Sequence, residues 1–335
     1  MNLLNFQLLL GNDLLTNFVD NMDVYFIMIV ALAFLAIGDL VVGVSNDAVN
    51  FLNSALGSKA ISVRKIMILA SLGVLVGSVF SSGMMEVARK GIFNPEMLLF
   101  SEIMIIFMAV MITDILLLDF FNTLGLPTST TVSIVFELLG AAVAVSLIKI
   151  SGLGSEFGDL VNYINVEKAS QIILGILLSV FIAFSIGALV QFISRTLLSY
   201  NYEQKSKWVG SVFGGVALTS ISYFILMKGI KGTSYAKESY DLLDGATISS
   251  FLETEVFMIS IVSFVLLSLI SYMLIFSFKV NIYKLIIGVG TFSLALAFAG
   301  NDLVNFIGVP IAAWQSYEAW IASSASAHMF SMGVL

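Results

Sequence analysis

The residues best suited to chemistry are two copies of one short polar motif. Asn-Asp-x-Val-Asn-Phe occurs at residues 46–51 and again at 301–306, and the two copies agree at five of six positions. On a helix, side chains three and four positions apart are neighbours, so the Asn, Asp and Asn of each copy share one face. Each copy is therefore a small polar cluster with one carboxyl group.

Each copy of the motif lies at the end of a long apolar run. This shared location makes the match significant, although it is only six residues long. An Asp near the centre of a bilayer costs about 2.5 to 3.5 kcal/mol, so Asp47 and Asp302 call for a partner, a cavity or an ion. The alternative is that both clusters lie at the membrane interface and merely cap helices. The rule that ionisable residues inside a membrane are functional favours the first interpretation.

A second polar feature, the hydroxyl segment, occupies residues 128–133. It reads Thr-Ser-Thr-Thr-Val-Ser and follows a break that contains Gly125 and Pro127. Pro near the first helical position with Ser or Thr beside it is typical of a helix start. The free amides and hydroxyls of such a start could hold a tetrahedral oxyanion, although an ordinary capped helix in a tight turn is the commoner use.

An anion site built from these parts would contain an electrostatic conflict. A carboxylate repels an oxyanion unless the carboxylate is protonated or a cation lies between the two. The presence of Asp47 and Asp302 therefore suggests coupling to sodium or protons.

Composition indicates a membrane protein. Hydrophobic residues make up 59% of the chain and charged residues 11%, against roughly 45 to 50% and 25% in soluble domains. The chain has no cysteine, one histidine (His328) and a net charge of -7. Thiol chemistry and a histidine metal cluster are thereby excluded, and nucleic-acid binding is not expected.

Apolar runs of about 20 residues, the length that spans a bilayer, repeat along the chain. Only helices fit such continuous runs, so the sequence predicts an all-α polytopic membrane protein with a helical bundle. Residues 1–23 lack Lys and Arg and form an N-terminal flank, followed by one transmembrane domain over 24–335. Eight segments are expected at 24–44, 66–85, 97–121, 128–148, 169–198, 208–227, 255–278 and 283–307, with a partial ninth from Trp314.

Seven spans separate the start of the first segment from that of the eighth, and an odd number reverses direction. The two motifs should therefore run antiparallel, as in the inverted repeats of secondary transporters. The first repeat would cover about 24–150, and the second would start at about 255–283 and be incomplete. Lys and Arg divide eight to seven between alternate loops, so loop charge does not predict the orientation.

Other acidic residues fall in or near the apolar segments. Glu86 and Asp119 lie near segment ends and are expected at the interface. Asp114 and Glu137 lie deeper, as cavity-facing groups or as structural partners shielded from lipid. Asp39 and Glu102 belong to the same set.

The ordered combination of these features resembles the PiT family of inorganic phosphate transporters. The quoted residues are Ser45, Asn46, Asp47 and Asn50, then Ala-Leu-Gly-Ser at 55–58, then Pro-Thr-Ser-Thr-Thr at 127–131. Gly-Asn-Asp-Leu-Val-Asn at 300–305 is similar to the second signature of that family. The resemblance spans nearly the whole chain.

The resemblance implies an inverted-repeat bundle that moves phosphate by symport with sodium or protons, and no enzyme activity or cofactor. It also implies a multi-pass protein of a cell membrane, bacterial inner or plasma, and is compatible with a homodimer. The implied substrate-binding residues are Asp47, Asn50, Ser129, Thr130, Thr131, Asp302 and Asn305. The implied cation-coupling residues, for a proton or one sodium ion, are Asn46, Asp47, Asn301 and Asp302.

Three departures from the family pattern bear on that expectation. Val132 stands where the family often has His, and Ser45 where it often has Gly. Pro127 lies 81 residues after Asn46, and the same spacing from Asn301 would reach position 382, past residue 335. A second hydroxyl segment is thus absent from these residues, as expected of a chain that lacks its C-terminal part.

Three alternatives stay open at the level of sequence. A sulfate carrier on the same scaffold would use the same helix termini, since sulfate is also a tetrahedral oxyanion. An intramembrane aspartyl protease could use two carboxyl groups that share a proton, but would not explain the Asn residues or the hydroxyls. A structural membrane subunit without a substrate is the third.

Overall fold

The computed structural model describes residues 23–79, 91–154, 156–198, 207–227, 236, 238–240 and 246–333. Within these ranges the chain is helical, and its β-structure is limited to three isolated bridges. Seven of the described helical stretches are long and apolar enough to cross a membrane. The prediction of an all-α polytopic membrane protein is confirmed.

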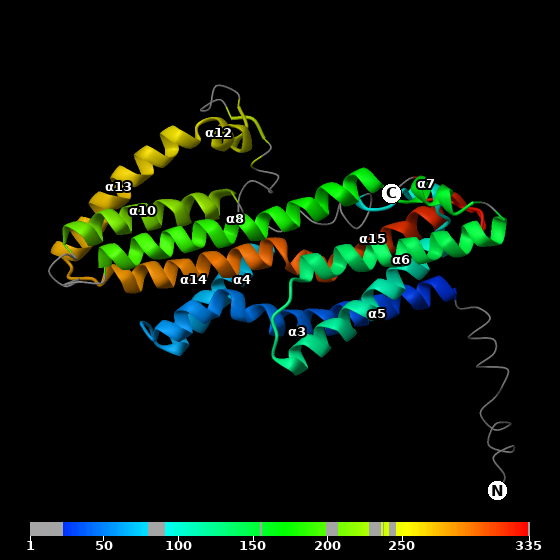
Figure 1. The fold of residues 1–335 in the computed structure, drawn as a ribbon, viewed down its shortest axis with the longest axis horizontal. Coiled ribbons are helices and arrows are strands. Elements are labelled where there is room, and N and C mark those ends of the chain that lie inside the picture. The colour runs from blue at the N-terminus through cyan, green and yellow to red at the C-terminus, as the bar shows by residue number, and fades with distance from the viewer. Residues whose placement is uncertain are drawn as a thin grey trace, which may run out of the picture.

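In the first half of the chain, the described residues form four long helices and three short pieces. The long helices are α3 (Val24–Ser58), α4 (Val63–Val79), α5 (Phe100–Leu124) and α6 (Thr130–Leu153). The short pieces are η2 (Pro95–Met97), η3 (Phe157–Asp159) and α7 (Leu160–Tyr163). Figure 1 shows α5 and α6 as a hairpin whose turn lies near the middle of the long axis of the molecule.

In the second half, the described residues form six further helices. They are α8 (Val166–Leu198), α10 (Trp208–Ile225), α12 (Ile248–Thr254), α13 (Val256–Phe276), α14 (Ile282–Asn301) and α15 (Leu303–Ser323). Helices α14 and α15 are nearly continuous, since only Asp302 separates them.

The turn between α5 and α6 has the residues that such a turn needs. Gly125 ends α5 in the left-handed region at φ 69°, which glycine adopts without steric cost. Ser129 begins α6 as an extended N-cap whose hydroxyl accepts a hydrogen bond from the Val132 amide at 3.4 Å. Residues 125–129 therefore form a short connection that presents the start of α6 to the rest of the bundle.

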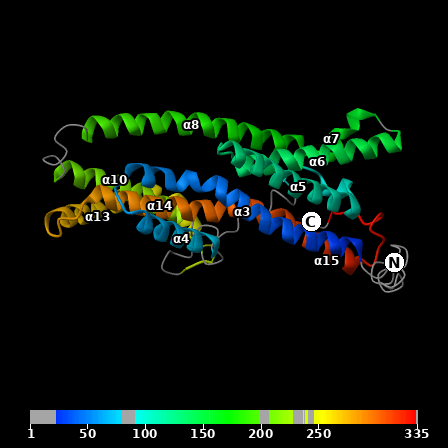
Figure 2. The ribbon, with the colours of Figure 1, turned by 90° about the horizontal axis from the view of Figure 1, so that it is seen from below.

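Helix α3 and the α14–α15 pair lie side by side and run in opposite directions (Figures 1 and 2). The first motif lies inside α3, and the second lies at the junction of α14 and α15. The antiparallel arrangement predicted for the two motifs is what the structure shows, and the two motifs meet near the middle of the molecule.

Three predicted boundaries were wrong. Helix α3 does not end with its apolar run at residue 44 but continues through the motif to Ser58. Polar side chains can continue a helix when another element satisfies them. The predicted eighth segment ends earlier, at Asn301, and Trp314 belongs to α15 rather than to a separate ninth segment. The second segment, α4, has 17 residues, and the end predicted for it at 80–85 lies outside the described residues.

Small residues bring several helices into close contact. A side chain at Gly73 or Gly77 of α4 would overlap the backbone of α14 at Phe292 and Leu296. In the same way, Gly43 of α3 leaves room for the ring of Phe306. Close approach at small residues is the usual means of helix association in lipid.

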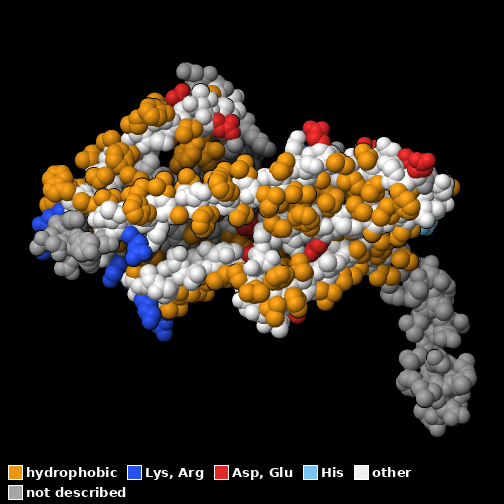
Figure 3. All heavy atoms as spheres, in the orientation of Figure 1, with side chains coloured by type: hydrophobic (Ala, Val, Ile, Leu, Met, Phe, Trp, Pro, Cys, Tyr) orange, Lys and Arg blue, Asp and Glu red, His pale blue; other side chains and the backbone are white. Residues whose placement is uncertain are grey.

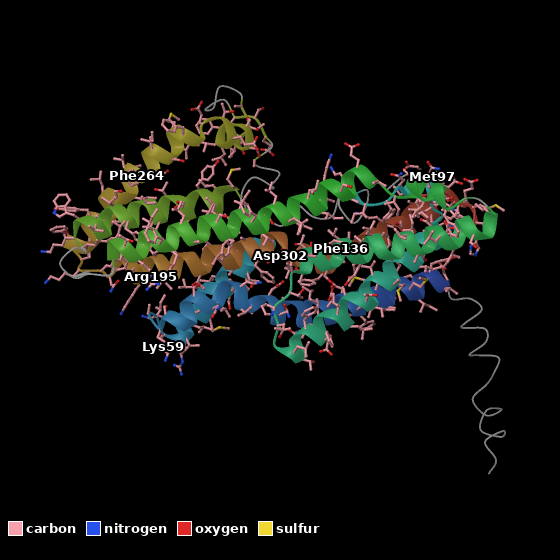
Figure 4. The ribbon with its side chains drawn as sticks, in the orientation of Figure 1. Lys59, Met97, Phe136, Arg195, Phe264 and Asp302 are labelled. Carbon is pink, nitrogen blue, oxygen red and sulfur yellow. The ribbon has the colours of Figure 1, made fainter. Side chains whose placement is uncertain are left out.

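Two buried clusters form the core. The larger joins the first half of α3 with α5, α6 and α15, while the smaller surrounds the motifs. The smaller cluster contains Phe51 and Phe306, the phenylalanines of the two motifs. The face of the molecule in Figure 3 is largely apolar over its length, as expected of a surface that contacts lipid. Lys and Arg side chains gather at one end, where Figure 4 labels Lys59 and Arg195.

Candidate functional site

The first Asn of the first motif holds the α5–α6 turn against α3. The amide nitrogen of Asn46 donates to Asn122 Oδ1 (2.9 Å) and to the Leu126 carbonyl (3.1 Å), and Asn46 Oδ1 accepts from the Thr128 amide (2.8 Å). Asn122 in turn donates to the Val42 carbonyl at 2.9 Å. Both amide protons of Asn46 are thus engaged, and one lone pair of its oxygen is left.

The carboxyl group of the first motif is buried and accepts two hydrogen bonds. Asp47 is 3% exposed. Its Oδ1 accepts from the Asn50 amide at 3.2 Å, and its Oδ2 accepts from the Thr130 hydroxyl at 3.3 Å. Asn50 and Thr130 therefore fix the orientation of the Asp47 carboxyl.

The second motif interrupts the helix at its Asp. Asp302 ends α14 and begins α15, at φ -90° and ψ -30°. Its Oδ1 accepts a hydrogen bond from the Thr131 hydroxyl at 3.2 Å. Asn305, one turn later, is buried and donates to the same hydroxyl oxygen at 3.0 Å. The Asn301 side chain lies outside what the structure describes.

The first turn of α6 joins the two motifs. Thr130 and Thr131 are consecutive residues, yet one contacts the motif of α3 and the other the motif of α15. Figure 4 shows Asp302, at the junction of α14 and α15, beside the N-terminal end of α6. The positive end of the α6 dipole points at the same region. Two carboxyl groups, hydroxyl donors and a helix N-terminus thus converge.

The charged side chains described at this site, Asp47 and Asp302, are both acidic. Asp47 and Asp302 are near enough for their charges to interact. Within the described ranges, the ion pair present is Lys149 with Glu102 at 2.8 Å, far along α6 from the motifs. An oxyanion could bind here only if a cation or a proton offsets the carboxylates.

A cavity adjoins the hydroxyl segment. Its volume is about 650 Å³, and it is lined by the α5 residues Thr113 and Phe121 and by Thr128, Val132 and Glu137, among others. Thr128 precedes the Thr130–Thr131 pair, so the cavity gives small solutes a volume next to the site.

The structure brings together six of the seven predicted substrate-binding residues: Asp47, Asn50, Thr130, Thr131, Asp302 and Asn305. Ser129, the seventh, uses its hydroxyl as the helix cap. Asn46, predicted for cation coupling, holds the turn between α5 and α6 through its side-chain amide. Their roles in binding and coupling stay predictions.

Two structural features near the site were not predicted from the sequence. The hydrogen bonds of Asn122 to α3 went unnoticed, although a polar residue at the end of a long apolar run is a signal for such a partner. The grouping of Asp39, Asp114 and Glu137 on three helices was also missed, because their separation in sequence hides it. Of the remaining acidic residues, Asp119 is exposed, and Glu86 lies outside the described residues.

Comparison with known proteins gives one matching family model, the Phosphate transporter family, over residues 43–335. A relative from Pyrococcus furiosus named "Putative phosphate permease" is 26% identical over 273 residues, covering 80% of this chain and 61% of the relative. A relative of the same name from Thermococcus kodakarensis is 25% identical over 198 residues, covering 55% and 44%. The chain thus spans less than two thirds of the length of these relatives.

One solved structure, "The sodium-dependent phosphate transporter", is similar over 92% of this chain and 88% of its own, with 20% identity and a TM-score of 0.46. Similarity at this level supports no transfer of residue roles. The family model covers most of the chain, including both motifs and the hydroxyl segment. The chain belongs to the phosphate transporter family, which is a family of transporters and not of enzymes.

Proposed function

We propose that this chain forms the transport domain of a secondary transporter that carries inorganic phosphate across the membrane together with sodium or protons. One observation supports this proposal most: Thr130 and Thr131 link the carboxyl groups of the two motifs at the start of one helix. Family membership and the names of the relatives support phosphate as the substrate.

The proposed phosphate site uses donors from three helices. Hydroxyls of Thr130 and Thr131 and the amides of Asn50 and Asn305 can turn from the carboxylates to the phosphate oxygens when phosphate enters. The exposed Ser129 lies at the same helix start. The dipole of α6 adds partial positive charge, as is common where helices bind phosphate.

Coupling follows from the same arrangement. Phosphate carries negative charge, and bringing it beside Asp47 and Asp302 is unfavourable unless positive charge enters with it. The proposed coupling group consists of Asp47 and Asp302, with the Asn46 oxygen and Asn301 as further ligands for a sodium ion. Either a sodium ion or a proton on these carboxyl groups would lower the repulsion.

The antiparallel motifs support an inverted-repeat mechanism. Helix α3 and the α14–α15 pair each supply one half of the proposed site, and the boundary between α14 and α15 lies beside it at Asp302. Discontinuous helices that meet at a central site are typical of transporters that alternate access between two sides. We expect the protein in a plasma membrane, and a homodimer is part of the same proposal.

The complete protein in proteoliposomes provides the test. We expect labelled phosphate to accumulate when a sodium or pH gradient is imposed, and we expect Asp47→Asn and Asp302→Asn to abolish accumulation. Asp119→Asn, at an exposed carboxyl on α5, is the matched control and should transport normally. Uptake of sulfate that excess phosphate does not inhibit would contradict the proposal.

A further inference from the structure

Three carboxyl groups from three different helices meet beyond the phosphate site. Asp39 lies on α3, Asp114 on α5 and Glu137 on α6, and we call them the carboxyl cluster. Asp39 and Asp114 are completely buried. Asp114 is in side-chain contact with both of the others. The cluster lies within membrane-spanning helices and is not part of either motif.

The hydroxyl of Ser133 reveals how many protons the cluster needs. Ser133 Oγ lies 2.8 Å from Asp114 Oδ1 and 2.7 Å from Glu137 Oε1. A hydroxyl has one proton and can donate to one of these oxygens only. The second contact is a hydrogen bond only if the other carboxyl group is protonated and donates to the hydroxyl oxygen. Hydrogen-bond geometry at Ser133 therefore requires one bound proton.

The surroundings of Asp39 also require a bound proton, for a separate reason. Among the described residues, neither oxygen of Asp39 meets a hydrogen-bond donor. Its contact is with Asp114, another carboxyl group. Two carboxyl oxygens can hydrogen-bond only when one of them carries a proton. Two protons among the three carboxyl groups would satisfy both Ser133 contacts and the contact between Asp39 and Asp114, and would leave a single negative charge.

Among the residues that the structure describes, no cation lies close enough to replace these protons. On α3, the charged group near the cluster is Asp47, whose charge interacts with that of Asp114 and with that of Asp302, and both of these are acidic as well. On α6 the nearest described cation is Lys149, about 18 Å along the helix from Glu137 and already paired with Glu102. On α5, Asp119 is exposed. An unpaired buried carboxylate is strongly unfavourable.

Helix α15, which contacts all three helices of the cluster, also offers no compensating positive charge. Helix α15 packs against α3, α5 and α6, and its titratable groups are Tyr317 and Glu318 near its far end. Tyr317 packs there against Phe26, on the first turn of α3. Within the described ranges, no three His, Cys, Asp or Glu side chains are arranged to hold a metal ion. The ligand that the cluster fits is the proton.

We propose that Asp39, Asp114 and Glu137 form a proton-binding site, connected by Ser133 to the first turn of α6. Ser133 follows Thr130 by three residues and so lies on the same face of the helix. Glu137 and Ser133 also line the cavity of about 650 Å³ beside the hydroxyl segment, which gives protons a route to the cluster. Loss or gain of a proton would change the bonding of Ser133 and shift the threonines that contact both motifs. This second part rests on the proposed transport function.

Infrared spectroscopy of the purified complete protein tests the site without any transport. A protonated carboxyl group has a C=O stretch separate from that of a carboxylate. We expect wild type to show this band at pH 7 and to lose it on titration to alkaline pH. Asp114→Asn and Glu137→Gln should each reduce or shift the band, while Asp119→Asn should not. A wild-type protein without the band at neutral pH, or a band unchanged in all cluster variants, would overturn the site.

A transport assay then tests separately whether the carboxyl cluster couples phosphate accumulation to a pH gradient. In proteoliposomes, Glu137→Gln should still exchange internal for external phosphate but lose the response of accumulation to a pH gradient. If accumulation in this variant follows the pH gradient as in wild type, the carboxyl cluster takes no part in coupling. If wild type shows the infrared band but neither binds nor moves phosphate, the proposed function fails while the proton site stands.

Discussion

The hydroxyl of Thr131 donates to the carboxylate of Asp302 across 171 residues of sequence, at 3.2 Å. Its neighbour Thr130 donates to Asp47, the corresponding Asp of the other motif. Two adjacent residues at the start of α6 thus connect two antiparallel helices. This link makes the repeated motif one site rather than two, and it determines the expected effects of changes to these residues.

Replacing Thr131 by Val should weaken phosphate binding while the shape of the side chain is kept. The change removes the donor to Asp302 and the acceptor for Asn305. Because an unsatisfied group in a site of this kind costs about 1 to 2 kcal/mol, phosphate affinity should fall roughly 5- to 30-fold. Equilibrium binding of labelled phosphate measures the effect. Thr131→Ser keeps the hydroxyl and serves as the control, and wild-type affinity in Thr131→Val would refute this role.

Replacing Asn46 by Ala should destabilise the protein. The change removes three hydrogen bonds that hold the α5–α6 turn to α3. We expect a lower apparent Tm in detergent, corresponding to roughly 1 to 3 kcal/mol. Asn50→Ala removes an exposed amide bonded only to its own helix and should leave the Tm nearly unchanged. Equal Tm values for the two variants would show that Asn46 does not clamp the turn.

Gly43 should tolerate no larger residue while Phe306 is present. A methyl group at Gly43 would overlap the Phe306 ring, and overpacking of this kind typically costs about 1 to 3 kcal/mol. Gly43→Ala should therefore lower the apparent Tm, and adding Phe306→Leu should recover part of the loss. Gly57, on the same helix, has open space around it, so Gly57→Ala is the control. If Phe306→Leu recovered none of the loss in Tm caused by Gly43→Ala, the close contact between Gly43 and Phe306 would be contradicted.

Cysteine cross-linking can verify that the second motif lies against α6. The natural chain has no cysteine, so Thr131→Cys with Asn305→Cys introduces the only two thiols. Their side chains contact each other at 3.0 Å in the native protein, and we expect an oxidant to link them within one chain. Thr131→Cys with Ser250→Cys, on the distant α12, should remain unlinked. If the first pair stayed unlinked and the second pair formed a disulfide, α15 would not lie against the start of α6.

The sequence predicted the helices and the candidate residues better than it predicted their contacts. Apolar runs identify membrane spans because helices are one of the few structures that satisfy their backbone in lipid. Gly125 and Pro127 mark the turn between α5 and α6, since neither residue favours the interior of a helix. The continuation of α3 to Ser58 was not predicted, because Asn46 and Asp47 are satisfied by residues about 80 positions away. The carboxyl cluster was not predicted for the same reason: its three members become neighbours only through helix packing.

Phosphate binding stoichiometry tests the central claim most directly, because one shared site and two separate sites give different counts. We predict that the complete wild-type protein binds phosphate at one site that involves both motifs. Asp47→Asn and Asp302→Asn should each remove that binding, and the double variant should be no worse than either. If each single variant kept a phosphate site and only the double variant lost all binding, the two motifs would act independently and the account would be wrong.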